Sequence, residues 1–167
     1  LEEIRKRGFS LFDIMILVER YLRGKERVEL LKALRGVDLH IFGNEEVWKK
    51  VVTKATFHGA VPFDKMREIF SKSRVVLNSV PMFKTCVHER FVYSLAAGAS
   101  VITNRSHFLE DEFPENRAVG YFLGPQYERV GEKIEKMLAH EDKRLEEVER
   151  ARETIKKSHT WDERVKT

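Results

Sequence analysis

The feature that most constrains the fold of this chain is a pair of apolar, β-branched segments separated by one helical pattern. The segments are Val75–Val80 and Ser100–Asn104, and the helical pattern covers Val87–Ala97. Segments with so few charged residues are typical of strands that are buried on both faces of a parallel sheet. Because parallel neighbours need a long crossover connection, the intervening helix fits a strand–helix–strand unit.

The same alternation continues along most of the chain. The pattern predicts further strands over Val37–Phe42, Thr56–His58 and Val119–Phe122, and further helices over residues 45–52, 62–72, 106–113, 126–139 and 142–157. Strands that alternate with helices in this order predict an α/β fold with a doubly wound parallel sheet and right-handed crossovers.

The first 36 residues differ, because they show helical spacing only. Apolar residues recur with a helical period over Leu1–Leu22 and again over Glu26–Leu34, and Gly24 separates the two stretches. We therefore predict an N-terminal helical segment over residues 1–36 and an α/β domain over residues 37–167. Since the chain begins at Leu1 inside a charged helical pattern, we expect it to be a fragment of a longer protein or a processed product.

Composition argues against several classes of function. The net charge of +4 is small and dispersed among alternating Lys and Glu residues, so we predict no nucleic-acid partner. Cys86 is the only cysteine, which rules out an internal disulfide and favours a reducing compartment, and we predict a cytoplasmic location. The longest apolar runs, such as Phe12–Val18, are too short to span a bilayer.

Several catalytic signatures are missing from the sequence. It contains no GxGxxG fingerprint, no GxxxxGK[ST] loop, no GxSxG elbow and no HExxH pair, and its six histidines are scattered. We therefore predict neither a nicotinamide cofactor nor a metal site, and the sequence identifies no catalytic residue.

Residues that favour an anion gather where the helix between the two apolar strands begins. Lys84, Thr85, His88 and Arg90 stand in or beside its first turn. Free backbone N–H groups and the helix dipole attract negative charge there, and ligands of open α/β sheets bind at the carboxyl ends of strands. We therefore predict a phosphate-bearing ligand here. The alternatives are that Arg90 pairs with a surface acid such as Glu89 and that His88 is only a solvated residue.

Two glycines follow predicted strands, in the sequences HIFGN and FHGAV. A glycine at the carboxyl end of a strand lets a ligand approach the backbone closely, so Gly59 is a candidate ligand contact. The alternative is that both glycines only form turns, which is a common role of glycine after a strand.

Four blocks of sequence, taken together and in order, resemble the C-terminal half of a group 1 GT-B glycosyltransferase. The blocks are FHGAVPFDKMREIFSKSRVVLNSV, HERFVYSLAAGASVIT, GYFLGPQYERVGEKIEKML and HTWDER, and the resemblance covers about Arg27 to Arg164. It is strongest to the spore-maturation-protein branch. The resemblance implies a Rossmann-like domain with an N-terminal helical appendage, which binds a nucleotide-sugar donor without a metal ion or cofactor.

The resemblance also implies roles for individual residues. Gly59 matches the loop that approaches the donor, and Asn78 ends the neighbouring strand. Arg90 and Gly98 match the first and last residues of the helix motif R-x-F-E-x-L-A-x-G. Lys84 and Arg90 are the residues expected to neutralise the diphosphate of the donor.

The sequence departs from the family at two positions. The glutamate expected three residues after Arg90, which binds ribose hydroxyls in the family, is Tyr93, and an earlier glutamate is replaced by Thr85. A tyrosine cannot accept a bidentate hydrogen bond as a carboxylate does. These departures favour a second hypothesis, in which the chain is a non-catalytic Rossmann-like module for protein or ligand binding.

The family's architecture implies further parts. In such enzymes an N-terminal acceptor domain closes on the donor domain, so we expect that domain elsewhere, or in a partner chain, and no sugar transfer by this chain alone. The first strand and glycine loop of the family are replaced here by the helical stretch Ser10–Leu22. His159, Thr160 and Arg164 match the final block, and we predict that Trp161 packs against the domain.

Overall fold

The computed structural model describes Lys6, residues 8–82 and residues 85–166. Its strands are β1 (His40–Ile41), β2 (Thr56–Phe57), β3 (Val75–Asn78), β4 (Ser100–Asn104) and β5 (Val119–Phe122). Its helices are α2 (Leu11–Ala33), α3 (Glu45–Lys49), α4 (Met66–Lys72), α5 (Glu89–Ala97), α6 (His107–Glu112), α7 (Glu128–Leu138), α8 (Glu141–Ser158) and α9 (Trp161–Arg164), with a 3-10 turn η1 (Phe63–Lys65). Strands and helices alternate from β1 to α7, as the sequence predicts.

The strands that the structure describes form two parallel sheets. β4 lies between β3 and β5, with Val75 opposite Ser100 and Val101 opposite Val119. Within the described residues β1 and β2 pair only with each other. The predicted α/β fold with parallel strands is therefore confirmed. The sheet is not continuous, however, because no described strand joins β1 to β3.

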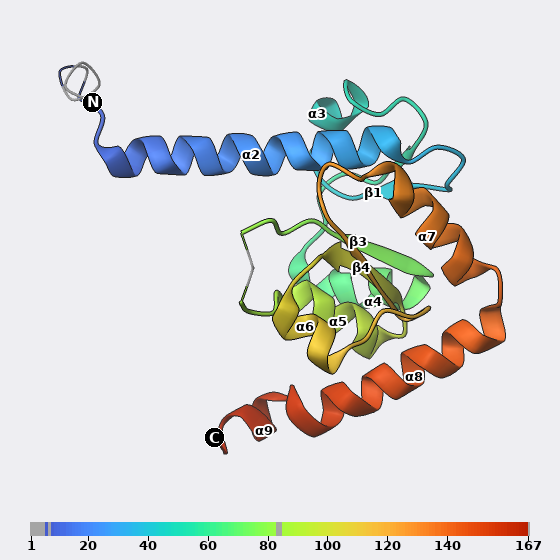
Figure 1. Ribbon diagram of the computed structural model, residues 1–167. Coiled ribbons are helices and arrows are strands. Elements are labelled where there is room, and N and C mark those ends of the chain that lie inside the picture. Colours follow the sequence, from blue (N-terminus) through green and yellow to red (C-terminus); the bar gives the residue numbers. More distant parts are fainter. Residues whose placement is uncertain (1–5, 7, 83–84, 167) are drawn as a thin grey trace.

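The N-terminal region is one continuous helix, so the prediction of two helices separated at Gly24 was wrong. α2 begins after Ser10, whose side chain accepts a hydrogen bond from Asp13 N while the Asp13 carboxylate accepts one from Ser10 N, forming a capping box. Gly24 lies inside the helix, where a glycine costs only about 1 kcal/mol relative to alanine. Figure 1 shows the C-terminal half of α2 against the domain and its N-terminal half extending beyond it.

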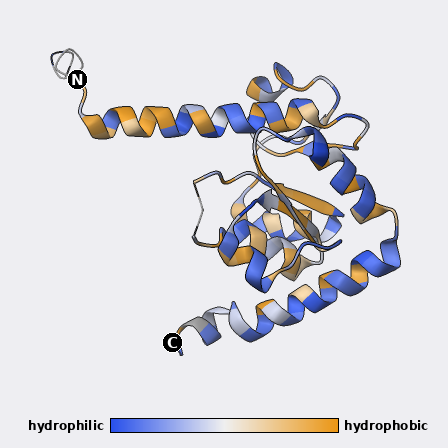
Figure 2. Ribbon diagram, viewed as in Figure 1, coloured by the Kyte–Doolittle hydropathy of each residue, from blue (hydrophilic) through white to orange (hydrophobic). Residues whose placement is uncertain are grey.

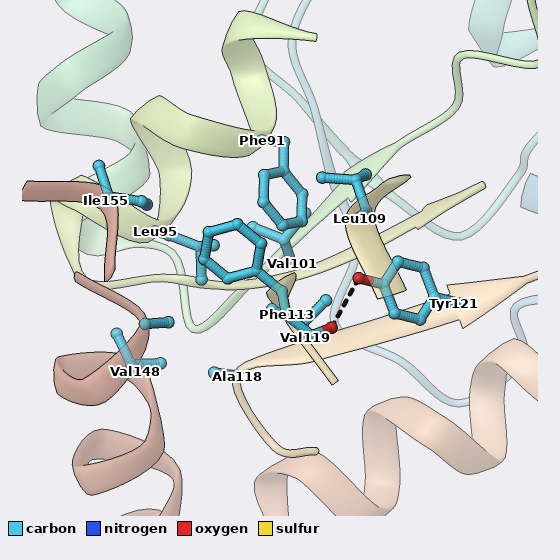
Figure 3. Close-up of a cluster of buried hydrophobic side chains, with 11 residues drawn as sticks. Phe91, Leu95, Val101, Leu109, Phe113, Ala118, Val119, Tyr121, Val148 and Ile155 are labelled. Atoms are coloured by element: carbon cyan, nitrogen blue, oxygen red, sulfur yellow. Dashed lines mark hydrogen bonds between the residues drawn. The ribbon is translucent and has the colours of Figure 1, made fainter. Parts of the chain in front are cut away.

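One face of the β3–β4–β5 sheet packs against α5, and α8 contacts α5 and runs below it in Figure 1. Phe91 and Leu95 of α5 are completely buried and pack with Val101 of β4. Figure 3 shows this cluster, in which Tyr121 Oη donates a hydrogen bond to the carbonyl oxygen of Phe113 at 2.7 Å. Burial raises the pKa of Tyr121, so this hydroxyl remains protonated and available as a donor.

The opposite face is covered by α7 and the C-terminal half of α2. Leu30 of α2 is 2% exposed and lies in the same cluster as Ile102 of β4. Gly120 allows α7 to approach closely, because a Cβ at this position would lie 2.9 Å from Cε of Met137. β4 is thus buried along its whole length, as its apolar sequence predicts.

The N-terminal half of α2 is apolar and exposed. The large side chains that protrude from it are Leu11, Phe12, Met15, Leu17, Val18, Tyr21 and Leu22. Figure 2 shows this stretch as mainly hydrophobic where it leaves the domain. Even so, no helix in the described part of the chain is both long and apolar enough to cross a membrane.

The C-terminal tail is held by a histidine rather than by a tryptophan. Trp161 is 73% exposed, so the prediction that it packs against the domain was wrong. Thr160 caps α9 by accepting a hydrogen bond from Glu163 N, and Trp161 follows as the first residue of that helix. His159 lies inward instead, with its ring 5.6 Å from that of Phe113.

A buried arginine ties α8 to the edge of the sheet. Arg144 is 3% exposed, and its Nη1 donates to the carbonyl oxygen of Arg74 at 3.2 Å and to Ser100 Oγ at 3.3 Å. Its Nε and Nη2 donate to the two carboxylate oxygens of Glu141 at 3.0 and 2.5 Å. The guanidinium therefore joins the start of α8, the start of β4 and the residue before β3.

Replacing Arg144 with methionine is expected to lower the free energy of unfolding by about 1.5–3 kcal/mol, the contribution of hydrogen bonds to a charged group. Urea unfolding measures the change. Arg150→Met is the matched control, because Arg150 is an exposed arginine of the same helix whose ion pair with Glu146 is also exposed. Its expected effect is within about 0.5 kcal/mol. Equal losses in the two variants would contradict the structural role of Arg144.

The same pair predicts a pH dependence. Hydrogen bonds from Arg144, and then from Arg74, lower the pKa of Glu141 from 4.5 to about 2. A carboxylate whose pKa is lowered by folding stabilises the folded state above its unfolded-state pKa, and this contribution is lost as the pH falls toward the folded-state value. The difference in stability between the wild type and Arg144→Met should therefore shrink between about pH 5 and about pH 2.

Candidate anion-binding site

Three elements meet at the carboxyl end of the β3–β4–β5 sheet: the strand ends, the start of α5 and the middle of α2. α5 begins at Glu89, and His88 Nδ1 caps it by accepting a hydrogen bond from Arg90 N at 3.1 Å. Asn78 is the last residue of β3, and Asn104 is the last residue of β4. The first turn of α5 therefore lies near the end of β3, as the strand–helix–strand unit predicts.

Arg90 is fixed over the end of β3 by a buried amide. Arg90 Nη1 donates to Asn78 Oδ1 at 3.1 Å. Asn78 Nδ2 donates to Thr103 Oγ1 at 3.2 Å, and that hydroxyl donates back to the Asn78 carbonyl oxygen at 3.1 Å. Asn78 and Thr103 are each 1% exposed. Because both partners are buried and hydrogen-bonded, the guanidinium is held at one position.

α2 brings a second arginine to the same place. Arg27 Nη2 lies 3.5 Å from the carbonyl oxygen of Ser79, at the outer limit of a hydrogen bond. Burial lowers the pKa of Arg27, and the positive charges of Arg23 and Arg90 lower it further. A positive charge that lowers the pKa of a neighbouring arginine also favours an anion beside the pair.

A carboxylate in the same network is already engaged. Glu26 Oε1 accepts hydrogen bonds from Ser79 Oγ at 2.8 Å and from Asn104 Nδ2 at 2.9 Å. Asn104 Oδ1 in turn accepts one from Val80 N at 2.6 Å. Glu26 thus attaches α2 to the ends of β3 and β4, and this attachment sets the position of the adjacent Arg27.

His88 is electrostatically part of the same cluster. Burial lowers its pKa most, the charge of Arg90 lowers it further, Arg27 adds a smaller effect of the same sign, and Glu89 opposes them. A lowered pKa keeps the imidazole neutral near pH 7. This agrees with its capping role, because an Nδ1 atom that accepts a hydrogen bond carries no proton.

The other predicted site residues on this side lie around α5. Thr85 is exposed in the turn before the helix, and Lys84 lies outside the described residues. Tyr93 is 37% exposed, and its ring packs edge-on against that of Phe63, with centroids 6.1 Å apart. Tyr93 therefore faces η1, one turn along α5 from Arg90.

The two predicted glycines lie apart from the arginines. Gly59 follows β2 with φ of +69°, and its carbonyl oxygen accepts a hydrogen bond from Gly43 N, so it belongs to the β1–β2 sheet. Gly98 ends α5 in a left-handed conformation with φ of +99°. A nine-residue helix is about 13 Å long, so Gly98 lies at the far end from Arg90. The structure thus brings together Asn78, His88 and Arg90.

An open groove of about 1060 Å³ adjoins this network, between α2 and the ends of β4 and β5. Glu26 and Asn104 belong to the network and also line the groove. Glu29 and Tyr127 line it further along, and carboxylates and a phenol are suitable partners for a hydroxyl-rich ligand. Within the described residues no three His, Cys, Asp or Glu side chains are grouped so that they could hold a metal ion.

Sequence reasoning missed Glu26, Arg27, Thr103 and Asn104. Arg27 and its partner Ser79 are 52 residues apart, and Glu26 and Asn104 are 78 apart, so no local motif connects them. A signal was present for Thr103 and Asn104, because polar residues that close an apolar strand lie where ligands of parallel sheets bind. No comparable signal marked the middle of α2.

Comparison with known proteins gives one informative result. The sequence model of a family described as glycosyl transferase-like matches residues 23–167. The match begins in the middle of α2, so it includes Glu26, Arg27 and the strand ends that they contact. No curated protein matches the chain significantly.

The charge of Arg90 predicts a measurable effect on its neighbour. Arg90→Gln is expected to raise the pKa of His88, because a nearby positive charge that disfavours imidazolium is removed. Glu89→Gln should shift it in the opposite direction. NMR titration of the histidine ring protons measures both shifts. An unchanged pKa in Arg90→Gln would show that the two side chains are not neighbours in solution.

Proposed function

Because the chain belongs to the glycosyl transferase-like family, we propose that it is the donor-binding half of a metal-independent glycosyltransferase of the GT-B type, of the spore-maturation branch. Its ligand is a nucleoside-diphosphate sugar. The observation that carries the proposal is the convergence of Arg27 and Arg90, both half-buried, at the start of α5.

A pair of arginines suits a diphosphate. Guanidinium groups present five N–H donors in a planar fork that matches phosphate oxygens. Arg90 uses Nη1 to bind Asn78, and this bond orients the group without exhausting its donors. The N-terminal N–H groups of α5 and the helix dipole add to the attraction. Thr85 and Lys84 come a few residues before this helix in the sequence and remain proposed contacts.

The same charges would stabilise the leaving group. In sugar transfer the bond between the anomeric carbon and a diphosphate oxygen breaks, and negative charge collects on the departing diphosphate. Fixed positive groups aimed at that charge lower the barrier, because they need no reorganisation during the reaction. The acceptor oxygen forms the new bond to the anomeric carbon, and its proton goes to a base that we assign to an acceptor domain or partner chain, together with the contacts to the acceptor.

The groove gives the rest of the donor a place to lie. It adjoins the network through Glu26 and Asn104, and its wall includes Glu29 and Tyr127. We assign the sugar to this groove, with carboxylates as acceptors for its hydroxyls. The nucleoside then extends along α5 toward Tyr93 and Gly59. A donor-binding half that is separated from an acceptor domain is expected to bind donor weakly and to transfer no sugar. We also propose a cytoplasmic location.

A second candidate function is a non-catalytic binding module. The observation that favours it is Tyr93, which stands where the family has a ribose-binding glutamate and packs against Phe63. A phenol that packs against a neighbouring ring offers the ribose hydroxyls fewer hydrogen-bond acceptors than a carboxylate does. Nucleotide affinity separates the two functions, because only the first requires it.

Arg90→Ala and Arg27→Ala are each expected to weaken uridine diphosphate binding by about 1.5–3 kcal/mol, the scale of a hydrogen bond to a charged group. This corresponds to about a ten-fold to hundred-fold rise in Kd. Calorimetry or a thermal-shift titration measures the change. Arg67→Ala is the matched control, because Arg67 is an exposed arginine on α4. An equal loss of affinity in Arg67→Ala would show that only the net charge of the chain matters, and not the position of the two arginines.

Tyr93→Glu is expected to tighten binding of nucleoside diphosphates, because a carboxylate accepts two hydrogen bonds from the ribose hydroxyls. The gain should be about three-fold to thirty-fold, the scale of one net hydrogen bond or somewhat more. Tyr93→Gln, which is neutral, controls for loss of the ring. Equal affinities in wild type and Tyr93→Glu would show that the ribose does not bind at this part of α5. They would also favour the function as a non-catalytic binding module.

A further inference from the structure

Two histidines at the small sheet point ring nitrogens at each other. His40 Nδ1 lies 2.8 Å from His58 Nε2, although the two residues are 18 positions apart in the sequence. β1 and β2 run parallel with Ile41 opposite Phe57, and this register places both imidazoles on the same face of the strands. The pairing is therefore a product of the fold, and the scattered histidines of the sequence give no sign of it.

Neighbouring rings hold the pair in place. The ring planes of His40 and His58 are nearly parallel, at an interplanar angle of 13°. The ring of Phe42 stacks on that of His58, with centroids 4.5 Å apart. Both histidines are nevertheless exposed to solvent, so an ion and its water ligands can reach the two nitrogens.

A carboxylate beside His40 favours one arrangement of protons. Asp38 Oδ1 lies 3.4 Å from His40 Nε2, the ring nitrogen that does not face His58. A negative charge there favours a proton on Nε2, which leaves a lone pair on Nδ1 directed at His58. In this arrangement His58 Nε2 carries the proton of the hydrogen bond between the rings. A carboxylate on the outer nitrogen is also the usual means of orienting a histidine that binds a metal ion.

We propose that His40 Nδ1 and His58 Nε2 together bind a late first-row divalent cation such as zinc, with Asp38 orienting His40 and water completing the coordination. Imidazole suits Zn²⁺, Ni²⁺ and Cu²⁺, whereas Mg²⁺ and Ca²⁺ prefer oxygen ligands. Zinc–nitrogen bonds of about 2.0–2.1 Å put two nitrogens of a tetrahedral ion about 3.3 Å apart, so the pair opens by only about 0.5 Å. The proton on His58 Nε2 moves to Nδ1 of the same ring, and both ligands stay neutral.

The cation site differs from the candidate anion-binding site in place and in chemistry. The histidine pair belongs to the β1–β2 sheet, whereas Arg90 binds Asn78 at the end of β3 in the other sheet. Neutral imidazoles with free lone pairs bind cations, and guanidinium groups bind anions. The proposal therefore goes beyond the proposed function and assigns the ion no part in sugar transfer.

Calorimetric titration with zinc chloride, without nucleotide or phosphate, tests the assignment. A Cys86→Ser background removes a competing exposed thiol. His40→Gln and His58→Gln should each raise the Kd for zinc by at least about ten-fold, because loss even of a residue that only orients a ligand costs this much. His107→Gln is the matched control, since this side chain is 99% exposed on α6. It should change the Kd by less than about two-fold.

Nitrogen NMR of the histidine rings tests the geometry. Zinc should shift Nδ1 of His40 and Nε2 of His58 at the same zinc concentration, while Nε2 of His40 stays protonated toward Asp38. Asp38→Asn should weaken zinc binding by about ten-fold and reduce this preference for a proton on Nε2. Zinc on Nε2 of His40 would contradict the proposed geometry.

Thermal unfolding gives an independent measure. Because only the folded chain holds the two rings together, zinc should stabilise the fold. At about ten times the Kd, the Tm should rise by about 3–6 °C. His58→Gln should abolish this rise, and His107→Gln should retain it. The zinc-induced change within each variant is compared, so a change in a variant's own stability does not affect the result.

Two results would overturn the proposal. One is an equal zinc affinity in His40→Gln, His58→Gln and His107→Gln, which would leave the pair as a hydrogen bond only. The other is zinc binding that depends on one histidine of the pair but not on the other, which would exclude a shared ion. Neither measurement involves a nucleotide, so the proposed function is tested separately.

Discussion

β4 is buried on both faces along all five of its residues, and most other elements take their places from it. Its parallel pairing with β3 and β5 fixes the sheet. α5 packs on one face through Phe91 and Leu95, while α7 and the second half of α2 pack on the other with Leu30. A strand with no exposed side must be covered by helices from both directions, which is why connections cross over it on alternate sides.

The polar residues that end these strands form the candidate anion-binding site. Asn78, Thr103 and Asn104 are buried, and they form hydrogen bonds with each other and with Arg90 and Glu26. This satisfies buried amides and at the same time holds Arg90 over the end of β3, near Arg27 of α2. The positive charge of Arg90 disfavours the charged form of Arg27, and the packing of α2 offsets this electrostatic cost. An anion bound beside the two arginines would relieve the repulsion between them. Structure and proposed function therefore depend on one set of bonds.

α2 behaves as two halves that are subject to different constraints. Its second half is fixed by Glu26 and Leu30, which bind the strand ends and the core. Its first half makes no comparable contact within the described residues, although it is the more apolar of the two. The capping box at Ser10 favours a helix there, although the large apolar side chains of this half remain exposed.

The sequence alone determined the α/β class, the bounds of β4 and β5, and the gathering of His88 and Arg90 at the start of α5, because hydrophobic period and helix ends are local properties. It did not determine that Gly24 lies inside a helix or that Trp161 is exposed, since a glycine's cost and a tail's packing depend on surroundings. Only the tertiary structure decided that Arg27 and Glu26 join the strand ends. These residues are 52 and 78 positions from their partners, and contacts over such separations arise from how helices pack on the sheet, which no spacing along the chain records.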